Sequence, residues 1–312
     1  MHRVCAGLLG SSLLAAAAPA GAAGQGASDR TVQVQMRNVA FHVDSSIVLG
    51  IHFARGALRR TSPEHAPYLD DKRSFVLDLD SARIGISPAA LAMLLNRYTF
   101  AYPGSPLRQL ALTIEHGRLR QHGRMHGISF DVVGDLSLTP EGDLRLHPTS
   151  IKAVGIKVGG LMKFFGLHLE KLVNTDRARG VHIDRDDFVL SPTQLLPPPE
   201  VAGRLGAVAL AADEIGLIFR PPDGRAAKAL ALPVEAANYM FFRGGVLRFG
   251  KLTMDDTDLL IVDRDQDDPF DFWLDRYNDQ LVAGSSRNTR DHGLIVRMPD
   301  FAKVAEGGQT VP

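Results

Sequence analysis

Residues 75–98 read FVLDLDSARIGISPAALAMLLNRY, and they combine an alternating segment with the start of a helix. Phe75, Leu77 and Leu79 recur at every second position, which is the period of a strand that buries one of its faces. This pattern predicts a strand over residues 75–86.

The residues that follow predict a helix. Ser87 can accept a hydrogen bond from a free backbone N–H group of the first turn, and Pro88 suits the first helical position because its missing donor costs nothing there. Pro103 and Gly104 mark the end of the helix. Its apolar stripe has the spacing i, i+3, i+4, i+7 and consists of Leu91, Leu94, Leu95 and Tyr98.

Further strands are expected on both sides of this stretch. Apolar residues alternate through 32–43, and short alternating segments separated by turns follow residue 105, which is typical of an antiparallel meander. A short helical turn is expected at Ser191-Pro192 and a helix at 271–281. The other expected strands cover 110–114, 118–121, 128–132, 136–138, 144–146, 151–158, 181–183, 188–190, 204–219, 239–242, 246–249, 259–262 and 294–296.

A second helix is predicted from residue 161 to about residue 174. Its apolar residues cover more than half of the circumference, and Lys163, Glu170 and Lys171 occupy the remainder. A helix with so wide an apolar face must be enclosed by the protein or contact an apolar ligand. Both interpretations stay open, because a protein core and the lining of a lipid tunnel use the same bulky, adaptable side chains.

Residues 1–23 have the three parts of a secretory signal. Arg3 supplies the positive charge, an apolar run follows, and Ala20-Gly21-Ala22 has the small residues of a cleavage site. We expect this segment to be removed and the mature protein to be exported to the periplasm. Since Cys5 is the only cysteine, the mature chain would contain no disulfide.

The composition restricts the function. The 312 residues include 35 Lys+Arg and 35 Asp+Glu, and this balance argues against a nucleic-acid-binding protein, which needs an excess of positive charge on one face. Motifs for a serine hydrolase elbow, a P-loop, a dinucleotide-binding loop and a zinc protease are absent from the sequence. The sequence therefore predicts no catalytic residue and no cofactor, and we expect that the protein is not an enzyme.

Three histidines, His116, His122 and His126, lie close together with three arginines between them. Imidazole groups can bind a metal, but the arginines would repel a cation, and no carboxylate is spaced to complete the ligand set. We expect a solvated basic rim here, which could contact an anionic head group, and no metal site.

The segment 255–279 contains ten aspartates. Asp263, Asp265 and Asp267 match the first half of a calcium-binding loop, whose ligands come from alternate positions. The sixth position lacks the required glycine, and the twelfth is Leu274 instead of glutamate. The incomplete motif favours a solvated turn, with calcium binding as the alternative.

The stretch from residue 75 to about residue 219 resembles the LmeA-like bacterial members of the tubular lipid-binding (TULIP) superfamily. The features that carry the resemblance are the strand 75–86 leading into SPAALAMLLN at 87–96, GRLRQHG at 117–123, the EGD turn at 141–143, IKAVGIKV at 151–158, GVHI at 180–183, FVLSP at 188–192 and LLPPP at 195–199. They cover a little under half of the chain.

The resemblance implies an α+β fold in which a long, curved antiparallel sheet wraps around an apolar helix. Residues 31–220 would form this TULIP-like domain. Residues 221–312 lie outside the resemblance, and we expect a β-rich extension whose further C-terminal strands complete the same sheet.

The resemblance also implies a function. The protein would be a periplasmic binding protein that holds the acyl chains of a phospholipid or similar amphiphile in an apolar tunnel, for lipid transport or homeostasis in the cell envelope. It would contact the membrane surface transiently. Apolar spacing selects the expected lining, which is Leu161, Met162, Phe165, Leu169 and Leu172 of the long helix, with Leu91, Leu94 and Leu95 closing one end.

Two alternatives stay open. A non-catalytic envelope scaffold or assembly factor would use the long helix as ordinary core and would have no ligand cavity. A hydrolase or metal-dependent enzyme would need a polar cleft in which carboxylates or histidines converge near residues 263–279.

Overall fold

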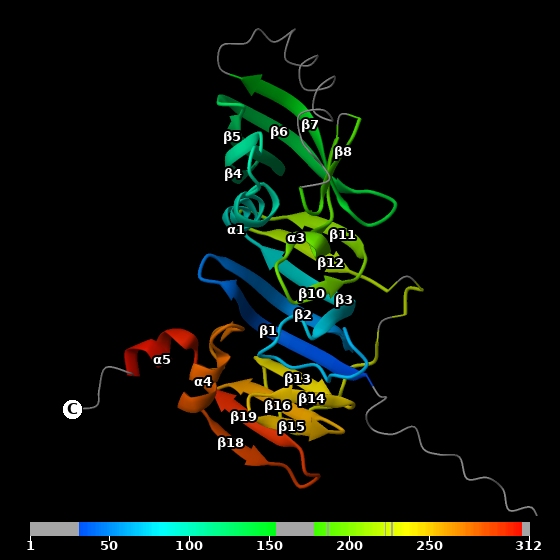
Figure 1. Cartoon of the computed structure of the whole chain (residues 1–312), viewed down its shortest axis with the longest axis vertical. Helices are drawn as coiled ribbons and strands as arrows, with labels where there is room; N and C mark the ends of the chain where they lie inside the picture. Colours follow the sequence, from blue (N-terminus) through cyan, green and yellow to red (C-terminus); the bar gives the residue numbers. More distant parts are fainter. Residues whose placement is uncertain (1–30, 154–177, 186, 222, 226, 308–312) are drawn as a thin grey trace, which may run out of the picture.

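The computed structural model describes residues 31–153, 178–185, 187–221, 223–225 and 227–307. This part of the chain is mostly β, with few helices, and of the predicted α+β fold it contains the large antiparallel sheet. The helix around which the sheet was expected to wrap, at 161–174, lies outside the described residues. Figure 1 shows an elongated molecule with a smaller sheet at one end and a larger sheet that continues to the other end.

The larger sheet has 11 strands. Its main path runs through β11 (Leu205–Leu210), β12 (Ile215–Phe219), β3 (Phe75–Ile86), β2 (Ile47–Arg60), β1 (Val32–Asp44), β13 (Tyr239–Arg243), β16 (Asp258–Asp263), β19 (Leu294–Met298) and β18 (Ser285–Asn288). Two short strands join it in parallel: β10 (Glu200–Ala202) pairs with β3, and β17 (Phe270–Trp273) pairs with β1. Strands from the chain after residue 220 thus pair directly with β1.

The apolar pattern of the central strands changes phase partway along, and local irregularities keep it on one face. In β3 the inward positions are odd up to Leu79 and even from Ala82 to Ile86, and the register with β2 shifts between these two parts. Such a bulge adds one residue and so returns the next apolar side chain to the same face. Asn38, with a φ of +50°, marks the corresponding change in β1.

The smaller sheet has six strands in the order β4 (Leu107–Glu115), β5 (Arg118–Met125), β6 (Ile128–Leu138), β7 (Leu144–Ala153), β9 (Asp187–Leu190) and β8 (Val181–Asp184). The predicted antiparallel meander is confirmed. Residues 151–153 do not begin a separate strand as predicted, because β7 continues through them while it pairs with β6. A two-stranded sheet of β14 (Val246–Phe249) and β15 (Leu252–Asp255) completes the described strands.

Helix α1 (Pro88–Leu94) begins as predicted, since Ser87 Oγ accepts a hydrogen bond from the first turn at 3.1 Å. It passes into a π-helical segment, η2 (Leu95–Thr99). The wider turn rotates the following residues, so Tyr98 is 38% exposed and donates its hydroxyl hydrogen to Asp44. The prediction that Tyr98 belongs to the buried stripe is therefore wrong.

Three further short helices are described: α3 (Pro192–Leu195), α4 (Tyr277–Ala283) and α5 (Phe301–Gly307). The helical turn predicted at Ser191-Pro192 is confirmed as α3. The helix predicted over 271–281 is correct only in its second half, because Phe270 and Phe272 are both fully buried at the period of a strand. Within the described residues, no helix has the length and apolar character needed to cross a bilayer.

Gln280 joins the C-terminal elements. Its side chain is fully buried in α4, and its amide group donates to the carbonyl oxygens of Asp271 at 2.7 Å and Pro299 at 2.9 Å. Its Oε1 accepts from the Trp273 backbone at 3.0 Å. One side chain thus satisfies backbone groups of β17 and of the segment after β19.

The variant Gln280→Leu should lower the free energy of unfolding by about 3 kcal/mol, because it leaves buried backbone groups without partners. Chemical denaturation with urea measures this loss. Val282→Ala is the matched control, since Val282 lies in the same helix but is 87% exposed, and it should leave stability unchanged. Equal stabilities of the Gln280→Leu variant and the unmodified protein would show that these bonds are unimportant.

Candidate apolar binding site

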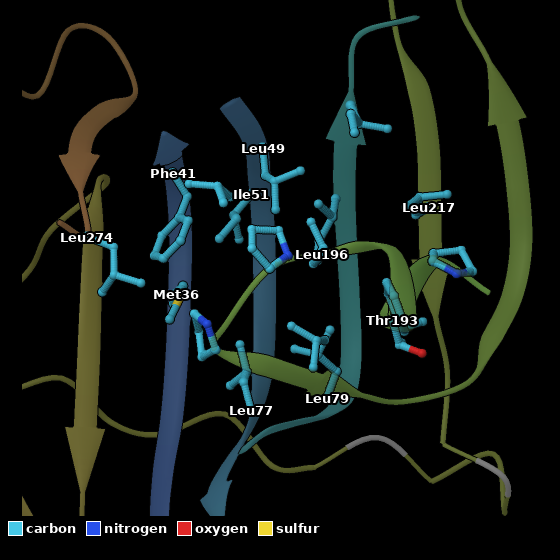
Figure 2. Close-up of a pocket in the computed structure, with 18 of the residues that line it drawn as sticks. Met36, Phe41, Leu49, Ile51, Leu77, Leu79, Thr193, Leu196, Leu217 and Leu274 are labelled. Atoms are coloured by element: carbon cyan, nitrogen blue, oxygen red, sulfur yellow. The ribbon is translucent and has the colours of Figure 1, made fainter. Parts of the chain in front are cut away.

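An apolar cavity lies between one face of the larger sheet and the segment 191–202, which crosses that face (Figure 2). Of the 28 lining residues in the part of the chain that the structure describes, only Thr193 carries a polar side-chain group. The lining from the strands includes Met36, Phe41, Leu49, Ile51, Leu77, Leu79, Ile84, Leu217, Phe219, Met240, Phe242 and Phe272. These side chains come from β1, β2, β3, β12, β13 and β17, so the cavity spans most of the width of the sheet.

The covering segment contains α3, three consecutive prolines and β10. The Ser191 N–H donates to the Gly180 carbonyl at 2.8 Å, and β10 pairs with β3, so both ends of the segment are fixed. Pro197 and Pro199 face the cavity together with Leu196. Proline has no N–H group, and these residues can therefore lie over an apolar surface without leaving a backbone donor unsatisfied.

The cavity has a volume of about 100 Å³. This is several times the roughly 10–15 Å³ that a single water molecule needs, but a stable buried water also requires two to four polar partners. With one hydroxyl in its lining, the cavity offers water almost no hydrogen bonds. Its surface suits hydrocarbon, which needs contact area and no polar partner.

Two of the sequence-predicted residues, Leu91 and Leu94 of α1, line this cavity. Leu91 also lines a second apolar cavity of about 30 Å³, between α1 and the smaller sheet, which Leu95 lines as well. Leu144 is shared by the two linings, so Leu91 and Leu144 separate one cavity from the other. The remaining predicted residues, Leu161, Met162, Phe165, Leu169 and Leu172, lie outside the described residues.

Sequence reasoning missed the lining from the strands. It assigned the site to helical stripes, whereas most lining residues are the inward positions of alternating strands. Alternation showed which strand positions are buried. It could not show that segment 191–202, which is distant in the sequence, lies over them. The LPPP sequence at 196–199 is the one local signal of this segment's role, because three prolines cannot form the hydrogen bonds of a strand inside a sheet.

Asp44 fixes α1 and η2 against the end of β1. Its carboxylate accepts hydrogen bonds from the Ser46 backbone at 2.7 Å, from Tyr98 at 3.1 Å and from Arg97 at 3.2 Å. Burial by itself would raise the pKa of Asp44, but the bonds from Ser46 and Tyr98 and the charge of Arg97 outweigh it and hold the pKa below its usual 3.8. The ionised form thus holds the helix that carries Leu91 and Leu94.

Asp44→Asn should therefore destabilise the protein in a pH-dependent way. Because the folded pKa lies below the unfolded one, the ionised carboxylate stabilises the fold above about pH 4, and this contribution is lost as the pH falls through the folded value. Urea denaturation should show a loss of about 1–2 kcal/mol at neutral pH that shrinks as the pH falls below about 4. Asp78→Asn, which removes an exposed pair with Arg59, should cost under about 1 kcal/mol. A loss at Asp44→Asn that is independent of pH would contradict this role.

The histidine group does not form one site. His116 and His126 lie in the turns at opposite ends of β5, and the exposed His122 pairs with Asp131 at 3.3 Å. Two of the intervening arginines also pair with carboxylates: Arg118 with Asp135 at 2.9 Å, and Arg120 with Glu115 and Asp131 at 3.1 Å. The expected rim is solvated, but much of its positive charge is compensated locally.

The aspartates of the incomplete calcium motif have different surroundings. Asp263 is fully buried at the end of β16, Asp265 pairs with Lys303 at 2.6 Å, and the Asp267 N–H donates to Asp265 Oδ1 at 3.1 Å. In the described part of the chain, the three carboxylates that converge are those of Asp263, Asp268 and Asp300. Sequence spacing could not indicate Asp300, because the pairing of β16 with β19 brings it there.

Comparison with known proteins gives no relative: no family model, no curated protein and no solved structure matches this chain. A function therefore has to be argued from the cavity and its chemistry.

Proposed function

We propose that the protein binds the hydrocarbon chain of an amphiphile, such as an acyl chain of a phospholipid, in the cavity beneath segment 191–202. The observation that carries the proposal is that the 28 described residues of the lining include a single polar side-chain group. Such a lining can distinguish hydrocarbon from water, but it has no charged group with which to bind a polar molecule. The head group of the ligand would stay outside the cavity.

The energy of such binding comes from the number of methylene groups that leave water. At about 0.8 kcal/mol for each, a segment of about eight methylenes contributes about 6 kcal/mol, which corresponds to a dissociation constant in the tens of micromolar. Ordering the chain reduces this value, and additional buried length increases it. The second cavity beyond Leu91 and Leu144 offers such additional length.

The resemblance to the TULIP superfamily and the signal-like N-terminus support a location of this activity in the periplasm. We propose a periplasmic protein that carries or stores envelope lipids and contacts the membrane surface transiently. The helix expected at 161–174 would add to the lining, and the sheet would wrap around it as in the TULIP fold. A scaffold that binds only proteins would leave the cavity without a use.

Lipid should accompany the protein through purification. We expect extraction of the purified protein with organic solvent, followed by mass spectrometry, to release phospholipid or fatty acid in amounts comparable with the protein. A clean extract from protein that also fails to bind added lipid would contradict the proposal.

A cavity-filling variant provides a second test. Leu77→Trp adds bulk to a half-buried lining position of β3, and it should weaken binding of a fluorescent fatty acid at least about tenfold by competing for the same space. Leu252→Trp is the control, because Leu252 is 51% exposed on β15 and lies outside the lining. Thermal unfolding should show that both variants are folded. Equal affinities of the two variants would place the ligand elsewhere.

A further inference from the structure

The carboxylates of Asp263, Asp268 and Asp300 converge where β16 and β19 end side by side. Each residue offers one oxygen, and these oxygens lie within 4.8 Å of one another. Ligand oxygens around one Ca²⁺ lie about 2.3–2.6 Å from the ion, so those on opposite sides are separated by up to about 5 Å. The spacing therefore admits one such ion between all three groups.

Asp263 carries the stronger indication that a cation belongs here. Its side chain is fully buried, and its Oδ2 has no hydrogen-bond partner. Oδ1 accepts from the Asp265 backbone at 3.0 Å. The nearby Asn238 amide donates to the carbonyl oxygens of Asp265 and Asp268, and its interaction with the Asp263 carboxylate only partly offsets the effect of burial on that group. A buried, unpartnered carboxylate oxygen is costly unless a cation or donor compensates it.

The charge of the cluster is also incompletely balanced. Asp265 joins the three converging carboxylates through Lys303, whose ammonium group contacts Asp265 at 2.6 Å and Asp300 at 3.1 Å. Among the described contacts, Lys303 therefore reaches two of these four carboxylates. Lys303 is half exposed on α5 and could move aside while Asp263 stays in place.

Burial, and to a smaller extent the charge of Asp300, raises the pKa of Asp263 to about 7. A divalent ion among these carboxylates would have the opposite effect and would favour the ionised form.

We propose that Asp263, Asp268 and Asp300 form a binding site for a hard divalent cation, for which Ca²⁺ is the best candidate. Carboxylate oxygens are the ligands that such ions prefer, and Ca²⁺ tolerates an irregular ligand set completed by water, whereas Mg²⁺ requires near-octahedral geometry at 2.0–2.1 Å. The exposed Asp268 leaves room for water on the outer side.

The ion would stabilise the part of the sheet beside the apolar cavity. Asp268 lies in the loop that precedes β17, and Asp300 Oδ1 accepts from the Asp271 backbone of β17 at 3.0 Å. Phe272 of the same strand lines the cavity. Bound cation would therefore fix this loop to the start of α5 and hold β17 against β1.

The test uses the full chain after treatment with a chelator. Isothermal titration with CaCl₂ and with MgCl₂ should show binding of Ca²⁺ with a dissociation constant of about 0.1–1 mM and weaker binding of Mg²⁺. The thermal midpoint of unfolding should rise with added CaCl₂, because the ion binds the folded state.

Three variants test the ligand set: one removes a proposed ligand, one is a control, and one removes a competing charge. Asp268→Asn should weaken Ca²⁺ binding at least about tenfold, and its exposed position keeps the folded state intact. Asp267→Asn is the matched control, because it changes the adjacent aspartate outside the cluster, and its affinity should stay within about twofold. Lys303→Met should strengthen binding severalfold, because it removes a competing positive charge.

The proposal is overturned if the unmodified protein gives no heat and no thermal shift with Ca²⁺ up to about 10 mM. It is also overturned if Asp267→Asn weakens binding as much as Asp268→Asn. That result would indicate that the ligands are those of the sequence motif Asp263, Asp265 and Asp267. Weaker binding by Lys303→Met would also overturn the proposal, because removal of a positive charge beside the ligands must favour a cation bound among them.

Discussion

The structure depends on how one apolar face of a large sheet is covered. The strands satisfy their backbone groups by pairing sideways, so the alternating apolar side chains of β1, β2, β3 and β12 form one continuous surface that must be shielded from water. The described cover is the segment 191–202, with a short helix, three prolines and one short strand, together with Leu91 and Leu94 of α1. The cavity is the space that remains beneath it.

The opposite face near β13, β16 and β19 is covered in a different way. Tyr239, Phe241, Leu260, Val262 and Ile295 form a second apolar cluster, against which residues of the segment 230–236 pack. Gln35 exchanges two hydrogen bonds with the Leu230 backbone, at 2.9 and 3.2 Å, and so fixes this segment. Burial on both faces explains why residues 239–242 and 259–262 are continuously apolar instead of alternating.

Local patterns predicted most of the strands but only a few residues of each candidate site. Alternation and turn residues located β3, β4 to β7 and β11 to β13, because those signals lie within a few residues. Residues 47–60 were not predicted, since their apolar positions change phase between Ile51 and Ala54 and interrupt the alternation. The cavity requires the long-range contact of segment 191–202 with the sheet, and the carboxylate cluster requires the pairing of β16 with β19. Neither contact leaves a periodic signal in the sequence.

Methyl-labelled protein mixed with a fatty acid that bears a nitroxide on its chain tests the central claim most directly. The nitroxide broadens the NMR signals of methyl groups near the bound chain. The account predicts the strongest broadening at Ile51, Ile84 and Leu217, which line the cavity, and weaker broadening at Val296, which lies outside its lining. Broadening confined to the exposed Leu252 and Val282, or to no methyl group, would contradict it.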